Sequence, residues 1–324
     1  MSERHGAAVV LSIAGSLCGI AAAEPPAFVD ERSRIEVQPS GSEFTQLRLD
    51  NPLGDIRVEG HDGTTIFVEA HKRAPDAASI DRLRVSLVPG ADGQVRIATA
   101  AVDGREFRPV ARSQVRIDLL IRAPRNARIE ASTAGGRLQI ENMDAGGELD
   151  SSSGSIAIRN VSGELITHSV SGPTSLEQIF GSVDAATLWS DVDLDSIGGQ
   201  RLVASATMGK IAGRRVRSQQ IELTTTHGAI MLEAEAAVAS QLVVSSLRGN
   251  VDVRVRHRGP VMVRARAPKV DLGPAVYTSD KVPTRGVADY RSGWSTAIVG
   301  PSGDPAAMVE LQSRYGYVQF AVVE

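Results

Sequence analysis

Length, composition and charge exclude several classes of protein. The chain has 324 residues, with 35 Lys and Arg against 38 Asp and Glu, and its net charge at pH 7 is −3. A dedicated nucleic-acid-binding protein is usually basic, so we expect no nucleic-acid partner. The single cysteine, Cys18, excludes a disulfide framework and a thiolate zinc site, and six histidines leave few ligands for a metal enzyme. The composition therefore predicts no metal site and no cofactor.

Residues 1–23 have the layout of a secretory signal peptide. A short polar start precedes the apolar stretch Ala7–Leu17, and the small residues Ala21 and Ala23 occupy the positions that a signal peptidase recognises. Cleavage after Ala23 would start the mature chain at Glu24, in the periplasm or at the cell surface. The alternative is a membrane anchor that stays attached, but the apolar stretch is shorter than the ~20 residues that a span needs. A membrane partner is expected only if the segment is retained.

Alternation of apolar and polar residues with a period of two dominates the mature chain and predicts β-strands. The run Val115–Ile121 is one example, and turn residues such as Asp92-Gly93 separate the runs. Pro75–Asp81 is the only helix-like segment in the middle of the chain. We expect residues 24–130 to form a less regular β region that stacks on the repeats at 131–324.

An internal repeat is the strongest signal in the sequence. Rows that restart at a small residue are 18, 18, 18, 19, 19 and 21 residues long, and a period near this length is typical of a solenoid. Parallel strands joined across a coil normally wind right-handed. The sequence therefore predicts an all-β fold, a right-handed parallel β-solenoid (β-helix) with 18–21 residues per coil and glycines at corners that often need positive φ. The rows start at Gly136, Gly154, Gly172, Ser190, Gly209, Gly228 and Gly249.

Two columns of the repeat are predicted to face the interior, because the second and fourth residues of each row are mostly aliphatic and share one face of a strand. Thr174 and Gly213 depart from this pattern. A second short strand follows in each row, with small residues at its later inward positions. The second-residue column is Leu138, Ile156, Thr174, Val192, Ile211, Ile230 and Val251; the second strands start at Leu149, Leu165, Val183, Leu202, Ile221 and Leu242, and the small residues are Thr167, Ala185, Ala204, Thr225 and Ser246.

The fifth column of the repeat is predicted to face water as a ladder of charges. Five of its six steps pair opposite signs, and each such pair is expected to contribute ~0.2–1 kcal/mol, at the low end when exposed. Glu235 and Arg256 repeat the pattern two positions later. The fifth column is Glu141, Arg159, Glu177, Asp195, Arg214, Glu233 and Arg254.

The C-terminal part is expected to close the solenoid. Val309–Ser313 and Tyr317–Val322 alternate like the strands of a last coil around Gly316, and we expect them to form a C-terminal cap. A Pro/Gly-rich loop is expected before them, at about 273–305.

Two segments carry a resemblance to a known family. Asn51–Gly60 and the Ser-x-Ser-Gly-x-Ile units, as in Ser151–Ile156, resemble a family of exported bacterial proteins with β-strand repeats and uncharacterised activity, related to adhesin head domains of the GIN type. The resemblance covers about residues 44–324. It implies a β-helical fold, a cell-envelope location and a binding or scaffolding role, and it supplies no catalytic residues.

Three carboxylates at alternate positions form one candidate site. Asp191, Asp193 and Asp195 would share an outer strand face, where they could bind Ca²⁺ or serve acid/base cleavage of a polysaccharide. The competing interpretation, which we favour, is a solvated acidic face partly neutralised by Arg214 in the next coil.

A run of arginines forms a second candidate. Alternating Arg and Val residues would present a basic outer face to an anionic glycan or to lipid head groups. A charged surface that pairs with Glu233 and Glu235 is the interpretation we favour. The run consists of Arg254, Arg256, Arg258, Arg264 and Arg266.

Other reactive side chains give weaker signals. His168 and His227 would lie about three coils apart, too far to share one metal ion. Trp294 and Tyr290 on the late loop could stack on a sugar ring or cover the side of the solenoid. The sequence shows no nucleophile elbow and no phosphate-binding loop.

The sequence favours a non-enzymatic, exported cell-envelope protein, an adhesin-like β-solenoid that presents a long face to an envelope protein or glycan. The alternative is a polysaccharide-degrading β-helix enzyme, a lyase or glycoside hydrolase. Such an enzyme would need a groove that joins the carboxylates of Asp191, Asp193 and Asp195 to a basic group such as Lys210.

Overall fold

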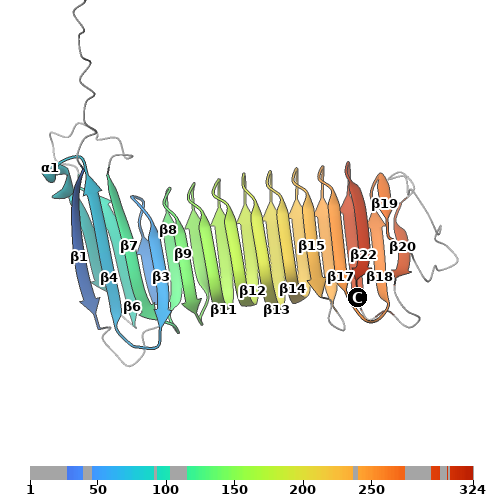
Figure 1. Ribbon diagram of the computed structural model, residues 1–324, viewed down its shortest axis with the longest axis horizontal. Helices are drawn as coiled ribbons and strands as arrows, with labels where there is room; N and C mark the ends of the chain where they lie inside the picture. The colour runs from blue at the N-terminus through green and yellow to red at the C-terminus, as the bar shows by residue number, and fades with distance from the viewer. Residues whose placement is uncertain are drawn as a thin grey trace, which may run out of the picture.

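The fold is known from a computed structural model, which describes residues 28–38, 46–90, 93–102, 115–235, 240–273, 293–299, 305 and 307–323. The expected signal peptide, the start at Glu24 and Tyr290 lie outside these residues. The fold is all-β, as predicted, and the strands stand side by side in a long open stack (Figure 1).

The strands form two rows that face each other. Four long strands bend from the first row into the second: β11 (Ile156–Ser169), β12 (Thr174–Thr187), β13 (Val192–Ala206) and β14 (Ile211–Thr225). In spatial order the first row holds β1 (Val29–Val37), β4 (Ile66–Ala74), β7 (Arg116–Pro124), β3 (Ile56–His61), β9 (Leu138–Met143), the first parts of β11–β14, β15 (Ile230–Glu235), β17 (Val251–Arg256), β22 (Tyr317–Val323) and β19 (Lys269–Asp271). The second row holds β5 (Leu83–Pro89), β6 (Gln94–Ala101), β2 (Gln46–Asp50), β8 (Arg128–Thr133), β10 (Gly147–Ser151), the second parts of β11–β14, β16 (Gln241–Ser246), β21 (Ala307–Ser313), β18 (Val261–Arg266) and β20 (Ser295–Val299).

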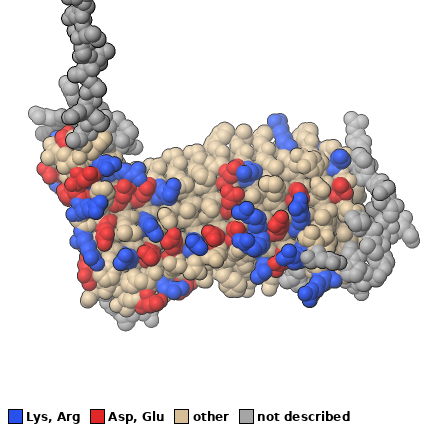
Figure 2. Space-filling view, viewed as in Figure 1, with Lys and Arg blue, Asp and Glu red and all other residues tan. Residues whose placement is uncertain are grey.

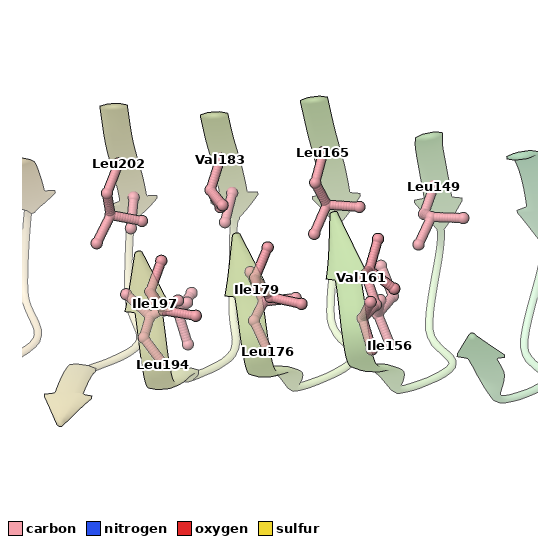
Figure 3. Close-up of a cluster of buried hydrophobic side chains, with 14 of the residues drawn as sticks. Leu149, Ile156, Val161, Leu165, Leu176, Ile179, Val183, Leu194, Ile197 and Leu202 are labelled. Atoms are coloured by element: carbon pink, nitrogen blue, oxygen red, sulfur yellow. The ribbon is translucent and has the colours of Figure 1, made fainter. Parts of the chain in front are cut away.

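The first-row register is the one that the repeat predicts. Ile156 pairs with Leu138 on one side and with Thr174 on the other, and the parallel pairing continues in the same way to Val251. All of these column residues are buried. They face the apolar side chains of the second row across the interior, as Leu176 and Val183 do in Figure 3. The core is therefore a continuous apolar layer between the two rows.

The predicted second-row register is wrong by two residues at Leu149, and correct from Leu165 to Leu242. Leu165 pairs with Gly147, and Leu149 pairs with Thr167. The small residues expected at later inward positions, Thr167, Ala185, Ala204, Thr225 and Ser246, are all buried; Thr225 pairs with Ala206 and Ser246, one inward site beyond the column of Ala204. The inward sites of β10 hold residues of very different size, Gly147 and Leu149. The pattern of apolar residues alone therefore does not determine the register of this strand.

The recurrent glycines are required by close stacking, and the predicted reason, positive φ, is wrong for them. A Cβ on Gly154 would lie 1.7 Å from the carbonyl oxygen of Gly136 in the neighbouring repeat, and Gly228 meets the oxygen of Gly209 at the same distance. The left-handed backbone lies at the other corner, between the two rows. One column of residues there is not glycine and has φ from 52° to 61°: Asn142, Asn160, Gln178, Ser196 and Arg215. Glycines with positive φ follow at the same corner, Gly146, Gly163, Gly181 and Gly199.

Hydroxyl side chains brace the glycine corners. The hydroxyls of Ser169, Thr225 and Ser313 each accept a hydrogen bond from the N–H of the residue three positions later, which is a glycine in every case. The Thr225 and Ser313 hydroxyls also donate to the glycine carbonyl of the neighbouring repeat. Each hydroxyl therefore satisfies buried backbone groups that no strand partner reaches.

The two departures from the aliphatic column have different structural outcomes. At Gly213 the side chain of Leu232, in the next repeat, fills the space that a side chain would occupy, because a Cβ there would lie only 2.7 Å from Cδ1 of Leu232. At Thr174 the side chain is 1% exposed and its hydroxyl has no hydrogen-bond partner among the described residues. The column therefore remains filled at Gly213 and carries an unsatisfied polar atom at Thr174.

Toward both ends of the stack, the order of the strands departs from their order in the sequence. Strand β3 lies between β7 and β9, although β7 follows it in the chain. At the other end β22 lies between β17 and β19, and β21 lies between β16 and β18 (Figure 1). The expected C-terminal cap is therefore wrong in position: the last strands fill a slot inside the stack, and β18–β20 cover them.

The N-terminal end is closed by antiparallel strands. Strand β1 pairs with β4, and its charged side chains are held by ion pairs from Lys72 to Glu31 at 2.7 Å and from Arg73 to Asp30 at 3.0 Å. Charges on an edge strand discourage pairing with a further chain. The helix-like segment Pro75–Asp81 contains one turn of helix, α1 (Ala77–Ile80), capped by the Asp76 carboxylate, which accepts from the N–H of Ser79.

Candidate binding groove

A groove of about 610 Å³ crosses six successive strands of the second row where they turn into the corners. It runs along the stack, at right angles to the strands, from the end of β2 to the end of β13. Two columns of side chains form its walls, one before and one after the last buried residue of each strand. The first wall is Asp50, Ser132, Asp150, His168, Ala186 and Ser205, and the second is Pro52, Ala134, Ser152, Val170, Leu188 and Thr207.

The first wall is polar at its N-terminal end. Parallel pairing places Asp50 beside Ser132 and Asp150 beside His168. The Ser132 hydroxyl donates to the Asp50 carboxylate at 3.2 Å. Carboxylates, hydroxyls and an imidazole thus follow one another at the spacing of neighbouring strands, about 4.8 Å. This wall offers hydrogen-bond acceptors and donors to a ligand that lies along the groove.

The second wall becomes apolar toward the middle of the stack. Val170 and Leu188 are 48% and 41% exposed and line the groove, and the next corner residues, Trp189 and Met208, are 59% and 41% exposed. We call these four residues the apolar ridge. Scattered exposed apolar residues are normal, but a contiguous group on one edge is typical of an interaction site.

Backbone hydrogen bonds between corners hold the ridge in register. The N–H of Trp189 donates to the carbonyl of Val170 at 2.9 Å, and that of Met208 donates to the carbonyl of Leu188 at 3.0 Å. The corners therefore continue the strand pairing beyond the strands. Their side chains are fixed on rigid backbone, which lowers the entropy cost of binding.

Charged residues are distributed unevenly around the groove. None of its lining residues is Lys or Arg, although arginine is abundant elsewhere in the chain. Figure 2 shows positive and negative side chains in a band over the strands, and few charges along the upper edge of the middle of the stack, where the corners before β12–β14 lie. The groove thus combines two carboxylates with an uncharged, partly apolar border.

Two of the three carboxylates of the candidate acidic site, those of Asp191 and Asp195, are engaged in separate ion pairs. Asp191 precedes β13, accepts from the backbone N–H of Lys210 at 2.9 Å and lies 3.6 Å from the Lys210 ammonium. The Asp195 carboxylate contacts the guanidinium groups of Arg214 and Arg215. Asp193 is exposed on the same strand. None of the three lines the groove. Among the described residues, no group of three or more His, Cys, Asp or Glu is arranged to hold a metal ion.

The candidate basic stretch does not form one face. Arg254 and Arg256 lie on β17 in the first row, whereas Arg264 and Arg266 lie on β18 in the second row. The chain crosses from one row to the other at Gly259, so residues that are close in sequence end on different faces. The expected pairs form: Arg254 with Glu233 at 3.9 Å and Arg256 with Glu235 at 3.5 Å.

The predicted charge ladder is present along most of the first row. Arg159 pairs with Glu177 at 3.8 Å, and Arg214 with Asp195 at 3.6 Å. The step from Arg214 to Glu233 crosses a register shift between Gly213 and Val216. Beside the ladder, Arg217 donates two hydrogen bonds to the Glu235 carboxylate, at 2.6 and 2.9 Å. These hydrogen bonds lower the pKa of Glu235, against a smaller opposing effect of burial.

The other candidate residues, His168, His227 and Trp294, do not come together in one site. His168 lies in the groove wall on β11, whereas His227 lies at a corner after β14, so they share no site. Trp294 lies against the stack, with the guanidinium of Arg264 5.1 Å from its ring centre. This position favours the expectation that it covers the side of the stack. Within the described part of the chain, no helix is long and apolar enough to cross a membrane.

The groove was not among the sites expected from the sequence, but its signal was present there. On three of its six strands the walls are the residues on either side of the Ser or Thr in a Ser/Thr-x-x-Gly unit, such as Ser169–Gly172. An apolar residue directly after that hydroxyl, as at Val170 and Leu188, is exposed by the corner and marks the ridge.

Comparisons with known proteins found similar solved structures at low sequence identity. No protein-family model and no curated protein matches the chain. Similar solved structures include a "putative cell adhesion protein" from Clostridium sporogenes (11% identity, TM-score 0.29, 91% of this chain and 100% of the other), a "putative adhesin" from Parabacteroides merdae (9%, 0.36, 91% and 97%) and a "putative lipid binding protein" from Parabacteroides distasonis (11%, 0.44, 90% and 97%). Adhesins are thus among the neighbours, as the sequence resemblance predicted. At these values the likeness carries no information about a ligand or an activity.

Proposed function

We propose that the chain is a non-enzymatic, exported, adhesin-like binding module of the cell envelope. In this proposal it is a right-handed parallel β-solenoid of 18–21 residues per coil that presents the groove to an envelope partner. Partners in the first row lie 18 to 21 residues apart along the chain, which supports the coil length. Removal of residues 1–23 would deliver the mature chain to the periplasm or the cell surface.

The groove with its apolar ridge is the observation that carries the proposal. It crosses six strands, its walls are held by backbone hydrogen bonds, and its exposed apolar side chains Leu188 and Trp189 lie outside the core. A rigid, elongated surface of this kind suits an extended ligand. The core has no need of these exposed side chains, so binding is the simplest use for them.

A polysaccharide-degrading enzyme is the second candidate, and the acidic residues support it less well. Asp191 and Asp195 are engaged by Lys210 and by two arginines, and they lie outside the groove. Acid/base cleavage needs two carboxylates on either side of a bound sugar. The enzyme would be favoured if new reducing ends or unsaturated products appeared with a polysaccharide panel and disappeared in Asp193→Ala.

Binding to envelopes tests the proposed function directly. Fluorescently labelled full chain is mixed with isolated cell envelopes and sedimented, and a Leu188→Ser/Trp189→Ser double variant is compared with the control Phe180→Ser. Phe180 is 69% exposed but does not line the groove. We expect the double variant to lose most of the sedimented fluorescence and the control to keep it. Equal binding by both variants, or no binding by the unaltered chain, would overturn the proposal.

Export is tested separately by N-terminal sequencing of the protein recovered from fractionated cells. A chain that begins at or near Glu24 outside the cytoplasm is expected. An intact Met1 in the cytosolic fraction would contradict export, and an intact Met1 in the membrane fraction would make residues 1–23 an anchor.

A further inference from the structure

We infer that the ligand of the groove is a neutral glycan chain that lies along the stack, an inference that rests on the proposed binding function. The groove joins a wall of hydrogen-bonding groups to a wall with an apolar border. Pyranose units have the matching character, because each ring has hydroxyls at its edge and a face of C–H groups.

Charge separates this ligand class from the anionic alternatives. The groove lining includes the carboxylates of Asp50 and Asp150 and has no Lys or Arg. A phosphate, a sulfate or a uronic acid would meet like charge there, and like charges across an interface cost several kcal/mol. A neutral hydroxyl, in contrast, donates a charge-assisted hydrogen bond to a carboxylate, which is stronger than a neutral one.

The geometry of the polar wall suits a chain of repeated units. Asp50, Ser132, Asp150 and His168 stand on consecutive strands, and Ser205 continues the wall at its far end. Strand spacing gives the wall a length of about 24 Å from Asp50 to Ser205. The step between neighbouring strands is close to the length of one sugar unit, so successive sugar units meet successive side chains, of which only Ala186 offers no hydrogen bond.

The apolar ridge supplies the second half of the recognition. Val170 and Leu188 border the groove opposite His168 and Ala186, and Trp189 extends the ridge with an exposed aromatic ring. Aromatic and aliphatic side chains pack against the C–H face of a sugar, while its hydroxyls remain free to bond to the polar wall. Both walls are therefore used by one ligand.

Affinity electrophoresis and calorimetry of the full chain test this inference. The probes are a soluble β-1,3-glucan, dextran and hydroxyethyl cellulose as neutral polymers, polygalacturonate as an anionic polymer, and phosphatidylglycerol vesicles. The groove variants are Asp150→Asn and Leu188→Ser, and Phe180→Ser is the control. All three sites are exposed, so far-UV circular dichroism and Tm should be unchanged.

We expect binding to at least one neutral polymer, weakened about tenfold by either groove variant and unchanged in the control. Binding only to polygalacturonate or to the vesicles, or neutral binding that the groove variants leave unchanged, would overturn the inference. So would an absence of binding to every polymer while the labelled chain still sediments with envelopes, which leaves the proposed function standing. A chain that binds neither polymers nor envelopes overturns both.

Discussion

The Ser246 hydroxyl accepts a hydrogen bond from the backbone N–H of Gly249 at 2.8 Å, and donates one to the carbonyl of Gly228 in the neighbouring repeat at 3.2 Å. One small side chain thus closes a corner and joins it to the next. The glycine permits the close approach, and the hydroxyl satisfies the polar groups that the approach buries.

Replacing that hydroxyl should destabilise the fold. Ser246→Ala leaves the N–H of Gly249 without its partner, and an unsatisfied buried donor costs about 1–3 kcal/mol. Denaturant unfolding should show this loss, whereas Ser245→Ala, one residue earlier on the outward face, should change stability by less than about 0.5 kcal/mol. An equal effect of the two substitutions would contradict the bridging role of Ser246.

Removal of the hydroxyl of Thr174, in contrast, should stabilise the fold. Its buried hydroxyl has no partner among the described residues, so Thr174→Val keeps the shape and removes the cost of burying a polar atom. We expect an increase of about 1 kcal/mol in the free energy of unfolding. The matched change Thr187→Val should decrease it, because the Thr187 hydroxyl accepts from the N–H of Ser190. A loss of stability in Thr174→Val would show that its hydroxyl is satisfied.

Adjacent glycines provide a test of close stacking. A Cβ at Gly136 would lie 1.8 Å from the carbonyl oxygen of Gly54, whereas one at Gly135 would meet only the Ser153 hydroxyl, at 3.3 Å. Gly136→Ala should therefore cost about 1–3 kcal/mol or more by overpacking. Gly135→Ala should be close to neutral in the same thermal unfolding experiment. Similar melting temperatures for the two variants would contradict the stacking distance.

Acid should remove the contribution of the Arg217–Glu235 ion pair to the stability of the fold. Because Arg217 lowers the pKa of Glu235 in the folded chain, the pair stabilises the fold above the ordinary pKa of glutamate, and this stabilisation is lost as pH falls through the lowered value. The difference in Tm between the unaltered chain and Glu235→Gln should therefore narrow as pH decreases in the acid range. The double variant with Arg217→Gln should lose no more than Glu235→Gln alone, because Glu235→Gln already removes the pairs with both Arg217 and Arg256. A difference in Tm that is constant with pH would argue against the pair.

The sequence predicted the first row well because its inward sites are large aliphatic residues at a fixed spacing. Ile156, Val192 and Ile230 define a face that only one register buries. In the second row the inward sites alternate between large and small residues, as at Gly147 and Leu149, so the pattern does not distinguish neighbouring registers. The groove was missed because Val170 and Leu188 directly follow the buried residues Ser169 and Thr187 and so lie outside the inward columns that define the repeat.

The order of strands at the two ends could not be derived from the repeat. β3 and β22 have the same pattern as the repeats beside them, and a periodic pattern does not specify which copies are neighbours. Chain connectivity favours consecutive neighbours, and the structure departs from it at both ends. Long-range pairings such as Val251 with Val318 depend on the fit of whole strands and not on local sequence.

The interleaved C-terminal strand changes how the molecule responds to tension. A force applied at the C-terminus acts first on β22, where Val318 and Gln319 pair with β17 on one edge and with β19 on the other. A strand at a free end would peel away one hydrogen bond at a time. Here two sets of backbone bonds share the load and must shear together, so the terminal strand resists extraction more strongly than its few residues would suggest.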